Sequence, residues 1–157
     1  MKRRLYSILL FVLLTFSTVT VFAEETEEVE WFEMTEGEDS NIPSQGITNP
    51  YNLYLGNVYT SISYLGNYDI MLRAEVCCSD TVASIQTTFY LQKKYSGVWT
   101  TVSEGTATKT NSNYMYKNMY VYDVTAGTYR CVTNTKVTSS SGYAETMESY
   151  SPSVTIS

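Results

Sequence analysis

The sequence contains no histidine and only three cysteines in 157 residues, and charged residues make up only 17% of it. Without histidine, the chain cannot form the Ser-His or Cys-His pairs of most hydrolases, and it lacks the commonest zinc ligand. The acidic residues from residue 50 onward show no pairing typical of a two-carboxylate glycosidase. We therefore expect a protein that is not an enzyme and that needs no metal or cofactor.

Positive charge is also scarce after the first four residues. From residue 50 onward the sequence has seven basic and seven acidic residues, whereas nine acids lie between Glu24 and Asp39. A neutral domain with an acidic arm offers no electrostatic footprint for nucleic acid or for an anionic membrane. We expect neither as a partner.

The longest hydrophobic run lies at the start of the chain. Basic residues at 2–4 precede an apolar run at 5–16, and Val-Phe-Ala at 21–23 ends it with residues that a signal peptidase accepts. This order is typical of a secretory signal peptide over residues 1–23. Because the run with residues 19–22 approaches the roughly 20 residues of a spanning helix, an uncleaved anchor is the alternative. We expect cleavage, and a secreted product that leaves the membrane.

Residues 24–49 combine the acidic run with Gly37 and Pro43, and they have too few apolar residues to build a core. We expect a disordered acidic leader that the domain does not need for folding. Trp31 and Phe32 interrupt this leader. They are either incidental aromatics in a flexible arm, which is the interpretation we favour, or a short motif that docks on the domain or on a partner.

Over residues 50–157, Thr, Ser, Tyr and Val alternate with the period of half-buried strands. The clearest case is 68–79, where Ile70 and Leu72 share one face and Arg73 and Glu75 share the other. Turn residues separate the segments at the spacing of an antiparallel sandwich. The pattern predicts an all-β domain, an antiparallel β-sandwich of about seven strands, at 58–64, 68–79, 83–94, 98–102, 114–124, 127–137 and 143–156.

Two resemblances follow from particular residues. Gly127-x-Tyr129-x-Cys131 resembles the penultimate strand of immunoglobulin-like domains, where a tyrosine corner precedes a bridge cysteine. The Tyr-Leu-Gln-Lys-Lys at 90–94, the Ser-Gly-Val-Trp-Thr-Thr-Val at 96–102 and an ending rich in Ser and Thr look like an uncharacterised family of short secreted proteins from Gram-positive bacteria. The resemblances imply an immunoglobulin-like fold and export, and no activity.

Three cysteines in an exported chain indicate one disulfide and one remaining thiol. Cys78 shares its predicted face with Leu72 and other apolar residues, whereas Cys77 shares the opposite face with charged residues. We therefore expect a bridge between Cys78 and Cys131, with Cys77 at the surface. The Cys77 thiol is then either tolerated in a monomer or used to link a dimer.

The strand from Tyr114 to Tyr122 alternates tyrosines with Met, Lys and Val. One of these two sets must face the core, and the sequence leaves open which one. With the tyrosines outside, Tyr114, Tyr116, Tyr120 and Tyr122 form a candidate ligand surface whose rings are spaced for stacking on sugars, or they merely stabilise the sheet.

These features predict a secreted, non-catalytic module that binds an unknown extracellular protein or glycan. Two alternatives are a carbohydrate-binding module that uses the surface tyrosines, and a structural or effector protein that dimerises through Cys77.

Overall fold

The computed structural model describes residues 29–37 and 53–157. The predicted signal peptide, and residues 24–28 and 38–49 of the predicted leader, lie outside the described residues. Every regular element in the described ranges is a β-strand, so the predicted all-β class is confirmed. None of the described residues forms a helix that is long and apolar enough to cross a membrane.

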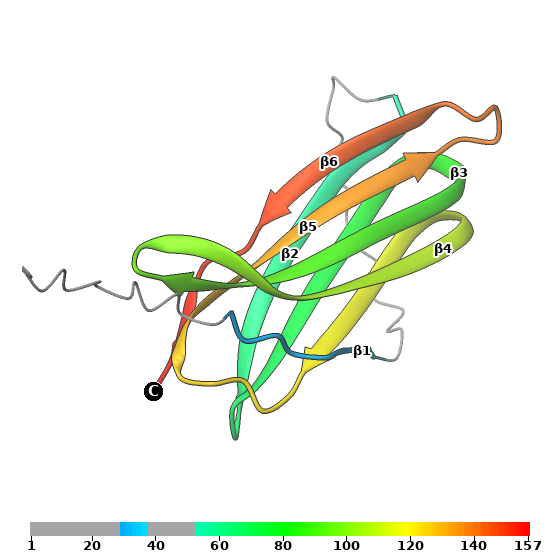
Figure 1. Cartoon of the computed structure of the whole chain (residues 1–157). Helices are drawn as coiled ribbons and strands as arrows, with labels where there is room; N and C mark the ends of the chain where they lie inside the picture. The colour runs from blue at the N-terminus through cyan, green and yellow to red at the C-terminus, as the bar shows by residue number, and fades with distance from the viewer. Residues whose placement is uncertain (1–28, 38–52) are drawn as a thin grey trace, which may run out of the picture.

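The strands pair in one antiparallel sheet that is not closed (Figure 1). The order is β1-β4-β3-β5-β6, with β2 also paired to β3 and β7 to β5. Their bounds are β1 Met34–Glu36, β2 Leu55–Gly66, β3 Asp69–Tyr95, β4 Val98–Val121, β5 Gly127–Thr138, β6 Ala144–Tyr150 and β7 Val154–Ile156.

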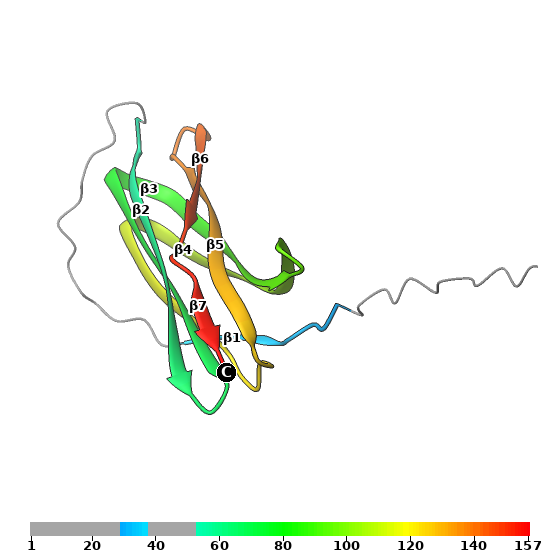
Figure 2. The same cartoon turned by 90° about the vertical axis from the view of Figure 1, so that its left-hand side faces the viewer.

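The long β3–β4 hairpin builds both layers of a sandwich-like fold. The first part of β3, up to Cys77, pairs with β2 and with the last part of β4, whereas β3 from Ser84 onward pairs with β5 and with the first part of β4. The register between β3 and β4 shifts between Cys77 and Val82, where the hairpin changes layer. Figures 1 and 2 show this change of layer: the tip of the β3–β4 hairpin bends across the other strands.

The hairpin turn itself follows from its sequence. Tyr95 pairs with Val98, so the loop has two residues, and Ser96 and Gly97 both have positive φ (46° and 91°). Such turns match the twist of the flanking strands, and glycine adopts this backbone conformation without strain. The predicted turn at Ser96-Gly97 is therefore confirmed.

The core divides into two clusters along the sandwich. The larger cluster joins residues of both layers, among them Leu72, Leu91 and Tyr129, which are 0% exposed. The smaller cluster surrounds the place where β3 changes layer and contains Val76 and Ile85. The inward face predicted for 68–79 is thus confirmed.

Strand boundaries differ from the prediction in two places. The segments predicted at 68–79 and 83–94 form one strand, and so do those at 98–102 and 114–124, because the two partners bend together and stay paired. Conversely, the predicted strand at 143–156 is divided into β6 and β7 around Pro152, which has no N–H to donate.

The expectation of a disordered leader is wrong for residues 29–37. Within this range, β1 pairs with the edge of β4, and Phe32 lies in the larger core cluster with 9% exposure. Although the leader as a whole is acidic, residues 29–37 alternate between inward and outward side chains, so they can pair with the edge of β4. Trp31, by contrast, is 59% exposed.

Candidate functional site

The tyrosine face of β4 points outward. Met115, Met119 and Val121 are buried, with exposures of 0%, 3% and 0%, so the alternating tyrosines lie on the opposite face. Lys117 shares the inward face and extends to the edge of the sheet, where it forms an ion pair with Glu36 of β1. The structure therefore places the Met and Val side chains of this strand inward and the tyrosines outward, a choice that the sequence left open.

The four tyrosines do not form an open row of rings. Tyr116 is only 6% exposed, and the Arg73 guanidinium lies 5.1 Å from the centre of its ring. Tyr114 and Tyr120 are half-buried, and Tyr122 is the one exposed member of the four. Tyr120 and Tyr122 stack at 6.2 Å with an interplanar angle of 9°. Most of the ring surface that a sugar would need is thus covered.

A second group of aromatic and cationic side chains lies on the outer face of the other layer. Trp99 of β4, Arg130 of β5 and Tyr150 of β6 come from three strands. The Arg130 guanidinium lies 4.5 Å from the Trp99 ring centre and 5.1 Å from the Tyr150 ring centre. Lys94, paired with Trp99 across the hairpin, places its ammonium 5.5 Å from the same Trp99 ring. We call these four residues the Arg130 cluster.

Hydrogen bonding orients the arginine further. Arg130 Nε donates to Gln92 Oε1 at 2.8 Å, and Gln92 also donates to Thr101 at 3.4 Å. Gln92 and Arg130 are directly paired in the β3–β5 register, so the backbone places the two side chains side by side. Among the described residues no hydrogen bond involves the terminal nitrogens of Arg130. The guanidinium is therefore oriented while its bidentate edge stays available.

The Arg130 cluster was missed in the sequence because its members are distant there. Trp99 and Tyr150 come together only through the β3–β4, β3–β5 and β5–β6 registers. Tyr150 is 53% exposed, and a hydrogen bond to the Glu148 carboxylate, together with desolvation, raises the pKa of its hydroxyl. No local motif signals such a cluster.

The predicted disulfide is absent. No bridge joins any two of the three cysteines, all of which lie in the described residues. Cys78 packs against the smaller core cluster, whereas Cys131 belongs to the larger one and pairs with Leu91. Cys78 does contact the core as predicted, but two residues on inward faces need not lie at the same height in a sandwich. Burial raises the pKa of both thiols, that of Cys78 to about 11 with a further contribution from Cys77.

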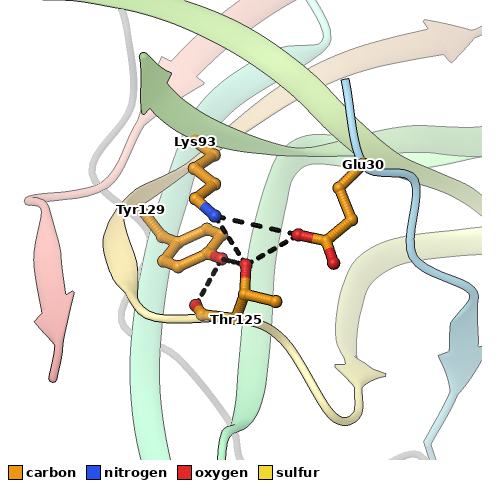
Figure 3. A network of polar contacts seen from close by, with 4 residues as sticks. All are labelled: Glu30, Lys93, Thr125 and Tyr129. Carbon is orange, nitrogen blue, oxygen red and sulfur yellow. Dashed lines mark hydrogen bonds and ion pairs between the residues drawn. The ribbon is translucent and has the colours of Figure 1, made fainter. Parts of the chain in front are cut away.

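A polar network fastens the residues before β1 to the domain (Figure 3). Glu30 Oε2 accepts a hydrogen bond from the Thr125 hydroxyl at 2.7 Å and lies 3.9 Å from Lys93 Nζ. Lys93 Nζ donates to the same Thr125 hydroxyl at 2.5 Å. The Tyr129 hydroxyl donates to the Thr125 carbonyl at 2.7 Å, which is the bond that defines a tyrosine corner.

A third polar contact holds the beginning of β2 to β6. The Glu145 carboxylate accepts hydrogen bonds from the backbone N–H groups of Leu53, Tyr54 and Leu55, at 2.7, 3.0 and 2.7 Å. Desolvation raises the pKa of Glu145, but the three hydrogen bonds together outweigh it, so the pKa lies below its usual range. This anion position is already filled by the chain itself.

Fold and surface together define an all-β, sandwich-like domain with an oriented arginine on one outer face. In the described residues no three His, Cys, Asp or Glu side chains gather closely enough to hold a metal ion. Compared with models of protein families and with curated protein sequences, the chain matches none. The resemblances to immunoglobulin-like domains and to secreted Gram-positive proteins stay predictions.

Proposed function

We propose that this chain is a secreted, non-catalytic binding module and that the Arg130 cluster binds carboxylate groups of an acidic glycan. The observation that carries the proposal is the state of Arg130. Two aromatic rings and Gln92 orient its guanidinium, while its terminal N–H groups keep no partner in the described residues. An oriented guanidinium loses little further entropy when it forms a bidentate bond to a planar oxyanion.

The surroundings favour a sugar acid over an isolated anion. Trp99 and Tyr150 hold the guanidinium against their rings, and Lys94 adds a second positive charge. Thr101 supplies a hydroxyl beside Gln92. A chain of uronic acids presents carboxylates for the two cations and hydroxyl groups for the polar side chains of Gln92 and Thr101.

Arg73 on the opposite layer provides a matched comparison. Like Arg130, it lies over a tyrosine ring and donates through Nε to an amide oxygen, that of Asn118, at 3.2 Å. It has one ring partner in place of two, and Glu75 lies two residues away on the same face of β3. Arg130 also has an acid nearby, since the Glu148 carboxylate forms a hydrogen bond with Tyr150, so its second ring partner and the Lys94 ammonium are what favour Arg130 over Arg73.

The test compares binding to alginate, a carboxylated polysaccharide, with binding to neutral dextran. The unmodified protein should be retained by alginate and not by dextran. Arg130→Lys keeps the charge but loses the bidentate geometry and should weaken binding at least about tenfold, since charge-assisted hydrogen bonds contribute about 1.5–3 kcal/mol.

Arg73→Lys is the control and should bind alginate like the unmodified protein. Equal retention on both polysaccharides would contradict the proposal, and so would unchanged alginate affinity in folded Arg130→Lys.

A further inference from the structure

Residues 29–37 lie along the edge of β4 opposite β3, on a surface that we call the seam. The Phe32 N–H donates to the Val102 carbonyl in the first part of β4, at 2.7 Å, and the Gly37 N–H donates to the Asn118 carbonyl in its last part, at 2.8 Å. These two parts of β4 lie in different layers, so the segment spans from one layer to the other. Figure 2 shows this crossing at the foot of the sandwich.

Alternate residues of the segment match the seam in charge and in shape. Glu30 meets Lys93, Phe32 and Met34 pack on the larger core cluster, and Glu36 meets Lys117. The lysine side chains are only 11% and 12% exposed, so the segment's two acids pair with cations that are largely removed from solvent.

Gly105 is the small residue of the seam at the point where Met34 of the segment packs. A Cβ atom at Gly105 would lie 2.8 Å from Met34 Sδ and 2.6 Å from Met119 Cε. A side chain at this position would therefore displace the ends of the Met34 and Met119 side chains. The seam, by which we mean Lys93, Val102, Gly105 and residues 117–121, therefore matches this strand in hydrogen bonding, charge and shape.

We propose that the seam of one molecule also accepts residues 29–37 of a second copy, so that the protein self-associates by exchanging its first strand. The segment precedes every other described strand, and its release leaves their pairings intact. In exchange, every contact made within one molecule is made between two, and only the association entropy opposes it.

The connection to the rest of the fold has sufficient reach. Residues 38–54 separate the segment from β2, and at roughly 3.3 Å per residue they can span about 55 Å. Such a length is compatible with docking on the same molecule or on a neighbour. The concentration of the protein then decides between the two.

A charge-reversal mixture tests the proposal on the full chain. Glu36→Lys alone and Lys117→Glu alone each place like charges at one end of their own seam. When the two variants are mixed, unfolded in mild denaturant and refolded, exchange restores both ion pairs at once. We expect a species of twice the monomer mass in the mixture, measured by light scattering with reductant present, and monomers for each variant alone at the same low concentration.

Two further samples complete the test. The double variant Glu36→Lys/Lys117→Glu matches its own seam and should stay monomeric at that concentration. Adding Phe32→Ala to both partners of the mixture removes the buried side chain and should abolish the dimer. A mixture that contains monomers alone would overturn the proposal, and so would a dimer that persists with Phe32→Ala, because such association would not use the segment.

Discussion

Replacement of Phe32 by alanine measures how strongly the segment holds to its own domain. Phe32 is 9% exposed and contacts the larger core cluster. Burying a phenylalanine side chain contributes about 1.5–3 kcal/mol, and Phe→Ala in a core costs about 3–5 kcal/mol when a cavity remains. In the Phe32→Ala variant, residues 29–37 can detach from the domain, and no cavity then remains. The free energy with which the segment docks therefore sets an upper limit on the loss of stability.

We therefore expect Phe32→Ala to lower the free energy of unfolding by about 2–4 kcal/mol. For a domain of this size that corresponds to a fall in Tm of roughly 10–25 °C. Thermal unfolding followed by circular dichroism gives the number. Hydrogen exchange gives the mechanism, since the amide of Gly37, bonded to the Asn118 carbonyl, should lose its protection when the segment leaves.

Trp31→Ala is the matched control. The Trp31 side chain is next to Phe32 in the sequence but is 59% exposed, so its replacement should change stability by less than about 0.5 kcal/mol. Equal effects of the two substitutions would refute the reasoning, since they would mean that alternation does not decide which aromatic is docked. A Phe32→Ala variant as stable as the unmodified protein would do the same.

Three further predictions concern the domain itself. The pKa of Glu145 lies below its ordinary value near 4.5, so its bonds stabilise the fold above that pH and are lost as the pH falls through the lower, folded value; the stability advantage over Glu145→Gln in urea titrations should shrink in that window. Tyr129→Phe should cost about 1 kcal/mol in the same titrations, because the Thr125 carbonyl loses its donor, and an unchanged midpoint would contradict the tyrosine corner. Mass spectrometry without reductant should find Cys78 and Cys131 as separate alkylated peptides after unfolding, whereas one linked peptide would contradict the structure.

Local patterns in the sequence predicted the features that depend on neighbouring residues. The inward face of 68–79 follows from an alternation of period two, and the turn at Ser96-Gly97 follows from backbone preferences of two residues. The hydrogen bond of Tyr129 reaches a carbonyl only four residues upstream, so a short motif can indicate it. Such interactions need no knowledge of the rest of the chain.

The tertiary structure decided whatever depends on register between distant strands. The bend of the β3–β4 hairpin places Cys78 and Cys131 in different core clusters, although each faces inward. The same registers bring Trp99, Arg130 and Tyr150 together on one face.

Phe32 shows the limit of composition most clearly. Its acidic surroundings predict an arm that cannot collapse by itself. The docking of the segment that carries Phe32 depends on the free edge of β4, on two lysines that the flanking acids pair with, and on the space that Gly105 leaves for Met34. The sequence by itself therefore determined which residues alternate, whereas only the folded domain determined which surface would receive them, because a buried side chain needs partners that lie far away along the chain.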